Sequence, residues 1–227
     1  MSRYDFHLSA AAVASSSPNF SWETHFGGDI DLADYVVGRS SILVDYEAVL
    51  GDEFRPFDPN QGNYTLEASS SVRVGETEIA GMFHHVSRHL SDRPKRFAIA
   101  WNILGARVLQ RVSAYGVTVD VVASAGKIVQ NSYVDYTWTG DVDLMIRRAV
   151  SPRLGVFAHG IGNGFLVDDT IAHRDNQFGG TVEVGLRING RGGAVELFAG
   201  AEQRVDADPI DRMTRRWALA GFRLLSK

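Results

Sequence analysis

A short segment near the middle of the chain gathers the residue types that acyl-transfer chemistry needs. It reads Phe83-His84-His85-Val86-Ser87-Arg88-His89-Leu90-Ser91-Asp92-Arg93. If this segment is a β-strand, side chains two residues apart share a face, so His85, Ser87 and His89 line up. A serine beside a histidine on one face can act as nucleophile and general base. The base needs a third group to orient its imidazole ring, and Asn102 on the following segment is the candidate.

A structural interpretation of the same residues stays open and is the favoured one. His89, Asp92 and Arg93 can clamp a loop through charge-assisted hydrogen bonds. His84 and His85 can lie at an interface as amphipathic side chains. A catalytic triad is recognised by its geometry, and spacing along the chain does not establish that geometry.

Composition removes several classes of protein. The chain has 227 residues, a net charge of -4 and no cysteine. The absence of cysteine excludes a disulfide scaffold, a thiolate metal site and a cysteine nucleophile. The slightly acidic balance supplies no basic field for nucleic acid, which we do not expect as a partner. No run of about 18 apolar residues exists, so the sequence predicts no transmembrane helix.

Alternation of polar and apolar residues with a period of two runs through the whole chain and predicts strands. The twelve strand candidates are 3–13, 20–30, 41–50, 63–74, 77–89, 97–112, 115–125, 132–149, 153–162, 177–189, 193–204 and 214–225. Most are as long as the roughly 9–11 residues that a tilted strand needs to cross a bilayer. Strands of soluble proteins average only about 5–6 residues.

The alternation gives candidate strands one apolar and one polar face. In 177–189, the apolar Val182, Val184, Leu186 and Ile188 alternate with Thr181, Glu183, Gly185 and Arg187. In 132–149, Val134, Tyr136, Trp138 and Val142 oppose a row of aspartates and threonines. A soluble sheet turns its apolar face inward, whereas a membrane barrel turns it toward lipid. In a barrel, the polar row would face the lumen, where it would either line a channel or close the lumen with ion pairs. The charged residues of this row are Asp135, Asp141, Asp143, Glu183, Arg187, Glu196 and Glu202.

The connections favour the membrane barrel. The gaps after the fourth, sixth, eighth and tenth candidates are tight, as in Val74-Gly75-Glu76, while most others are longer and polar. Short turns at one end and long loops at the other are typical of outer-membrane barrels. The exception is 31–40, which is long for a tight turn. We predict an all-β fold, a closed antiparallel up-and-down transmembrane β-barrel of about 12 strands, as one domain over 1–227. The alternative is a soluble lipocalin-like binding barrel.

The histidine–serine segment resembles outer membrane phospholipase A. The resemblance rests on His85-Val86-Ser87 and on Trp101-Asn102 in the next strand candidate. In that family a His-x-Ser-Asn-Gly motif supplies base and nucleophile, and a later Trp-Asn supplies the orienting asparagine. The resemblance implies a twelve-stranded lipid acyl hydrolase with Ser87 as nucleophile, His85 as base and Asn102 as orienting residue. Arg88-His89 replaces the family's Asn-Gly, and the spacing from His85 to Asn102 is a few residues longer.

A second resemblance covers the same residues. The segment from His85 to Asp92 is similar to the His-x-Ser-x-His-Leu-x-Asp signature of an uncharacterised family of bacterial outer-membrane barrels. Pro18-Asn19-Phe20 matches a second feature of that family, while Ser91 and Arg93 depart from its signature. The resemblance implies the barrel and the envelope location but no established activity.

Cofactors and partners follow only as expectations. The sequence identifies no cofactor with certainty, and calcium is a candidate because the phospholipase family uses it, although its ligands cannot be placed here. Asp168, Asp169, His173 and Asp175 offer oxygen and nitrogen donors in a late loop, but a solvated loop is the favoured interpretation. We expect a bacterial outer-membrane location, with membrane lipids and the outer-membrane assembly machinery as partners. The first residues show no charged and apolar leader, and removal of a signal peptide fits the other features best.

Overall fold

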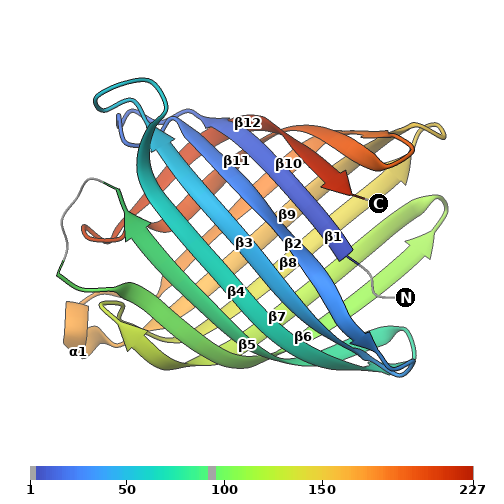
Figure 1. Cartoon of the computed structure of the whole chain (residues 1–227), viewed down its shortest axis with the longest axis horizontal. Coiled ribbons are helices and arrows are strands. Elements are labelled where there is room, and N and C mark those ends of the chain that lie inside the picture. The colour runs from blue at the N-terminus through green and yellow to red at the C-terminus, as the bar shows by residue number, and fades with distance from the viewer. Residues whose placement is uncertain (1–3, 92–95, 227) are drawn as a thin grey trace.

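A computed structural model describes residues 4–91 and 96–226, and these form one closed antiparallel barrel (Figure 1). Its strands are β1 (Tyr4–Val13), β2 (Trp22–Asp34), β3 (Arg39–Gly51), β4 (Asp58–Val74), β5 (Thr77–Leu90), β6 (Ile99–Ala114), β7 (Val117–Ser132), β8 (Tyr136–Ala149), β9 (Leu154–Val167), β10 (Gln177–Asn189), β11 (Gly193–Asp208) and β12 (Met213–Ser226). Every strand pairs with its neighbours in sequence, and β1 pairs with β12 to close the sheet. The predicted fold class is therefore confirmed. No helix in the described part of the chain is long and apolar enough to cross a membrane.

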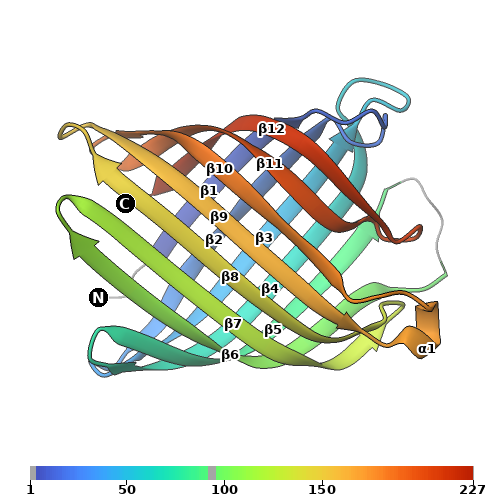
Figure 2. The same ribbon diagram turned by 180° about the vertical axis from the view of Figure 1, so that it is seen from behind.

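The two ends of the barrel differ as the sequence predicts. One end carries tight turns, and the other carries the longer connections and the short helix α1 (Asp169–Ala172) (Figures 1 and 2). The apparent exception at 31–40 disappears, because β2 continues to Asp34 through a register shift and only residues 35–38 connect it to β3. In outer-membrane barrels the long connections face outward from the cell, so we call this end the outer end.

Side chains are sorted with the apolar face outward. On β10, Val182 and Val184 are 61 % and 64 % exposed on the outside, whereas Glu183 between them is 8 % exposed. On β11, Leu197 is exposed and Glu196 is buried in the lumen. Apolar residues on the outside are stable only against lipid, so the barrel crosses a membrane. The lipocalin-like alternative is wrong because such a barrel has an apolar interior and a polar exterior.

The alternation fails at one predicted position. Tyr136 was expected on the same face as Trp138, yet Tyr136 is buried in the lumen and Trp138 is exposed outside. The β8–β9 register shifts between these two residues, and the extra residue Thr137 puts Tyr136 on the inward face. The inward phenol of Tyr136 donates a hydrogen bond to Asp206, which supplies the polar partner that a buried hydroxyl needs.

The outer part of the lumen is filled. Gln61 Nε2 on β4 donates to the backbone carbonyl of Ala207 on β11 at 2.7 Å, and Arg88 on β5 donates to the carbonyl of Asp206 at 2.6 Å. In the closed strand order, β4 and β11 have four strands between them on one side and six on the other, so these bonds cross the lumen. In the β1–β2 connection, Phe20 packs against Trp217 of β12 with ring centroids 5.3 Å apart. A cavity of about 680 Å³ remains in the lumen, lined by charged side chains.

Candidate functional site

The residues of the predicted triad lie on the lipid-facing side of β5 and β6, near the outer end. His85 is directly opposite Asn102 in the β5–β6 ladder, and Ser87 is opposite Ala100. The same outward rows contain Phe83 and Leu104, which are 46 % and 60 % exposed. Because strand side chains alternate, the row that is apolar near the membrane centre becomes polar as β5 approaches its end at Leu90. The shared face expected from the sequence is therefore present.

His85 and Asn102 form a direct contact. His85 Nδ1 lies 2.6 Å from Asn102 Oδ1. An amide oxygen only accepts hydrogen bonds, so Nδ1 carries the proton, and in the neutral ring Nε2 is the accepting nitrogen. This is the tautomer that a general base acting through Nε2 requires.

Sequence reasoning missed Gln130, which fixes the orientation of Asn102. Asn102 Nδ2 donates to Gln130 Oε1 at 2.9 Å, so the Asn102 oxygen is directed at His85. The β6–β7 register shifts from the pair Asn102–Gln130 to the pair Ile103–Ile128, so Val129 is the extra residue of a bulge. The bulge places Val129 and Gln130 on the same outer surface. Period-two alternation puts these neighbours on opposite faces, so the sequence contained no signal for Gln130.

Ser87 makes a different contact from the one expected. Its Oγ lies 3.0 Å from His89 Nε2, and within the described residues no hydrogen bond joins it to His85. The His89 ring in turn packs edge-on against Tyr64 on β4, with centroids 5.3 Å apart. Ser87 therefore lies between two histidines on one face and is bonded to the outer one. The remaining clamp residues, Asp92 and Arg93, lie outside the described residues, so the loop clamp stays a prediction.

The late loop uses its acidic residues for local structure. Asp168 caps α1, and its Oδ1 accepts from the Thr170 backbone N–H at 3.1 Å. His173 ends α1 in a left-handed conformation and is exposed. These roles fit the solvated loop that was favoured from the sequence.

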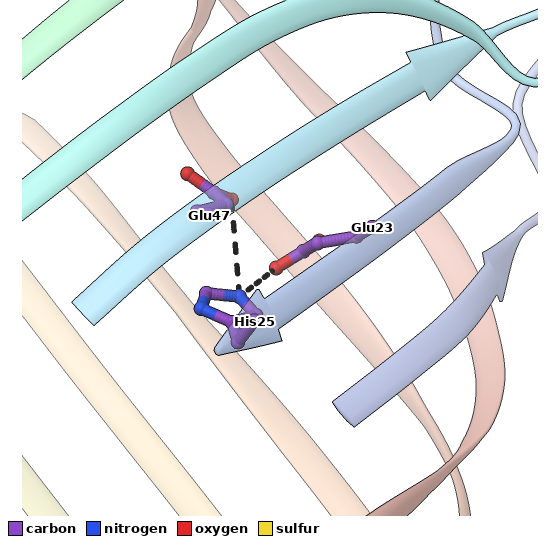
Figure 3. Close-up of side chains that lie close together, drawn as sticks. All are labelled: Glu23, His25 and Glu47. Atoms are coloured by element: carbon purple, nitrogen blue, oxygen red, sulfur yellow. Dashed lines mark hydrogen bonds and ion pairs between the residues drawn. The ribbon is translucent and has the colours of Figure 1, made fainter. Parts of the chain in front are cut away.

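The lumen holds a second group of polar residues that sequence reasoning did not bring together. Its charges form ion pairs between strands, such as Arg223 with Glu183 and Glu196 at 2.9 and 3.0 Å. In the described part of the chain, one group of three ligand-type side chains converges closely enough to hold a metal ion: Glu23, His25 and Glu47 (Figure 3). Glu23, His25 and Glu47 are not in the charged row predicted from the sequence, although the spacing of two between Glu23 and His25 puts them on one face of β2.

Comparison with known proteins identifies the kind of barrel. No protein-family model and no curated protein matches the chain. Among solved structures, outer membrane phospholipase A from Escherichia coli is similar, with a TM-score of 0.59, 13% identity and coverage of 99% of this chain and 92% of that one. The Salmonella typhi outer membrane phospholipase dimer with bound calcium has a TM-score of 0.58 and 12% identity, over 99% and 90% of the two chains. LpxR from Salmonella typhimurium has a TM-score of 0.54 and 9% identity, over 98% and 99%.

These structural similarities show the fold of the chain. The chain is an outer-membrane β-barrel of twelve strands, and its location is the bacterial outer membrane. The signature of the uncharacterised barrel family finds no matching family model and stays a prediction.

Proposed function

We propose that the chain is a serine hydrolase that cleaves acyl esters of membrane lipids. In this proposal Ser87 is the nucleophile, His85 the general base and Asn102 the residue that orients the base. The observation that carries it is the 2.6 Å contact between His85 Nδ1 and Asn102 Oδ1 on the outer face, two residues before a serine on the same face. Polar side chains in a lipid-facing row are costly, so their presence there calls for a function. The phospholipase resemblance supports the same roles.

The reaction would proceed in two balanced steps. His85 Nε2 takes the proton of Ser87 as Oγ attacks the acyl carbonyl carbon, and the ester C–O bond breaks. His85 returns that proton to the leaving oxygen, which releases the deacylated lipid. A water then gives a proton to His85 and attacks the acyl-serine, which releases a fatty acid and restores the Ser87 hydroxyl. Asn102 holds the ring in the required tautomer throughout.

The contact between Ser87 and His89 sets one condition on this mechanism. His85 and His89 are each two residues from Ser87 on the same face. Ser87 has a single heavy-atom torsion, and the mechanism requires the rotamer in which the hydroxyl faces His85 instead of His89. We therefore assign His89 the role of holding the hydroxyl in a resting position. Ser87 lies three residues before the outer end of β5, and the proposal puts it at the depth of the lipid ester groups.

Calcium does not fit the described residues around Ser87. The outward neighbours of Ser87 across the ladders are Tyr64 and Ala100, and neither offers a carboxylate. Calcium binds through six to eight oxygen ligands. The mechanism above therefore uses only side chains of the chain and water.

Phospholipid hydrolysis in detergent micelles tests the proposal. We expect Ser87→Ala and His85→Ala to lower fatty-acid release by a factor of at least about 10². The matched control is His84→Gln: His84 is adjacent in sequence but points into the lumen, where Nδ1 lies 2.9 Å from Glu67. His89→Ala should retain or raise activity if His89 only holds the resting hydroxyl. Equal release by the wild type and Ser87→Ala would remove the enzyme proposal.

The second candidate is a non-enzymatic structural or weakly channel-forming barrel. The bond between Ser87 and His89, packed on Tyr64, favours it because this arrangement stabilises the end of β5 without any catalytic base. It expects equal background release from all four variants and a lower unfolding stability for Ser87→Ala and His89→Ala.

A further inference from the structure

Three side chains of β2 and β3 converge inside the lumen. Glu23 and His25 are two residues apart on the inward face of β2, and Glu47 is opposite His25 on β3. His25 Nε2 lies 2.8 Å from Glu23 Oε1 and 3.9 Å from Glu47 Oε1. Figure 3 shows both carboxylates directed at the same nitrogen. One ligand atom from each residue lies within 4.8 Å of the other two.

The other ring nitrogen of His25 and the other carboxylate oxygen of each glutamate contact residues outside the cluster. His25 Nδ1 lies 3.0 Å from Asp45 Oδ2, while Asp45 Oδ1 lies 2.8 Å from His7. Histidines that bind metals generally donate their other ring N–H to a carboxylate, which fixes the ring and leaves one nitrogen for the ion. The pair of His25 with Asp45 is this arrangement, with Nε2 as the nitrogen directed at Glu23 and Glu47.

The two carboxylates are oriented in the same way. Asn63 Nδ2 donates to Glu47 Oε2 at 2.6 Å. Arg204 NH2 contacts Glu23 Oε2 at 2.5 Å. The oxygens directed at His25 are the other ones, Oε1 in both residues. These outer contacts orient His25 Nε2 and the two Oε1 atoms toward one position, where all three can bind the same ion.

The charges favour an added cation. Arg204 contacts Glu23, Glu47 and Glu202 at 2.5, 2.8 and 2.8 Å, so one guanidinium faces three carboxylates. Arg204 NH1 shares Glu47 Oε1, but a carboxylate oxygen has more than one lone pair and can serve two partners. Asp45 adds a fourth carboxylate, held between His7 and His25, and a divalent ion can take the place of the proton on His25 Nε2 among these carboxylates.

We propose that Glu23, His25 and Glu47 bind one divalent transition-metal ion of the zinc class inside the barrel. One imidazole nitrogen with two carboxylate oxygens suits such an ion better than calcium or magnesium, which prefer oxygen ligands alone. Glu23 and His25 also line the lumen cavity of about 680 Å³, which supplies water for the remaining coordination positions. The site is independent of the proposed hydrolase, since Ser87 faces lipid.

A second histidine of the lumen provides a matched control. His159 lies between Asp143 and Glu183, and it has the same complement of one imidazole and two carboxylates. Asp143 contacts Nε2 at 3.0 Å, whereas Glu183 is 3.6 Å from Nδ1. The two carboxylates therefore lie at different nitrogens of the ring and do not converge with one nitrogen on a single ion.

The test is a zinc titration of the folded, chelator-treated barrel in detergent, followed by calorimetry and by metal analysis after desalting. We expect about one zinc per barrel, no specific binding by His25→Ala, and wild-type binding by His159→Ala. Asp45→Asn, which keeps all three ligands, should weaken binding by a factor of about 10–100. The conservative variant Glu47→Gln should also weaken zinc binding. A folded variant migrates differently on SDS gels before and after heating, and this shift verifies that each variant is folded.

The proposal is overturned if the wild type binds no zinc, or if His25→Ala and His159→Ala lose binding equally. Stronger binding of calcium than of zinc would overturn the assigned metal class. Cobalt substitution adds a second measurement, since its visible spectrum reports nitrogen and oxygen ligation and should disappear in His25→Ala alone. None of these readouts depends on lipid hydrolysis.

Discussion

Removal of the Asp135 carboxylate should loosen the outer end of the barrel. Asp135, in the β7–β8 connection, is 1 % exposed and accepts from Arg174 Nε and NH2 at 2.8 and 2.7 Å. Arg212 NH1 is 3.3 Å away. Arg174 also contacts Asp206 at 2.7 Å, so one arginine joins the β7–β8 and β9–β10 connections to β11. Burial alone would lower the pKa of Arg174, but its bonds to Asp206 and Asp135 raise that pKa far above its usual range.

The contacts that Arg174 and Arg212 keep without Asp135 determine how much unfolding free energy is lost. Removing one partner of a buried ion pair costs about 3–5 kcal/mol when the other charge is left alone. In Asp135→Ala, Arg174 keeps Asp206, and Arg212 keeps its 2.6 Å bond to the Tyr133 carbonyl. We therefore expect a smaller loss of unfolding free energy, about 2–4 kcal/mol.

Urea unfolding from lipid vesicles, followed by tryptophan fluorescence, measures this loss. Asp175→Ala is the control, because Asp175 is an exposed carboxylate near Arg174 and its removal should change stability by less than about 0.5 kcal/mol. The double variant with Arg174→Ala should show a coupling energy of about 0.5–3 kcal/mol. A loss below 0.5 kcal/mol in Asp135→Ala, or no coupling, would refute the network as the element that holds the outer connections together.

Two further predictions test the sorting of faces and the closure of the lumen. Val184 faces lipid near the middle of β10, so Val184→Arg should lower the unfolding free energy in vesicles by about 2–4 kcal/mol. The control Tyr115→Arg, in a fully exposed turn, should have little effect. Equal effects of the two substitutions would contradict the outward apolar face. Arg88 crosses the lumen to the Asp206 carbonyl, so the wild type should show no steady conductance in planar bilayers and Arg88→Ala should show an increased leak. A large open channel in the wild type would show that the mouth is not closed.

The order of the strands and the positions of the candidate triad followed from local features of the sequence. Alternation with a period of two identifies a strand, and a tight turn determines the pairing of the strands on either side of it. His85 and Ser87 share a face for the same reason. Asn102 lies opposite His85 because only the connection after Leu90 separates β5 from β6, so their pairing is a contact between neighbours in sequence.

Departures from the regular ladder could not be predicted. Bulges at Val129 and between Tyr136 and Trp138 change which side chains face lipid, and they brought Gln130 to Asn102 and Tyr136 to Asp206. A bulge depends on which register with the neighbouring strand is most stable, and the alternation within one strand does not specify that register.

Contacts across the lumen required the closed barrel. Gln61 and Ala207 are 146 residues apart, and Glu23 meets Arg204 although β2 and β11 are not neighbours in the sheet. The tilt and stagger of all twelve strands determine which inward side chains face each other. Local alternation in the sequence therefore determines which face of its strand a side chain such as Glu23 occupies. The tertiary structure alone decided that Glu23, His25 and Glu47 have Arg204 beside them and that the outer mouth is filled.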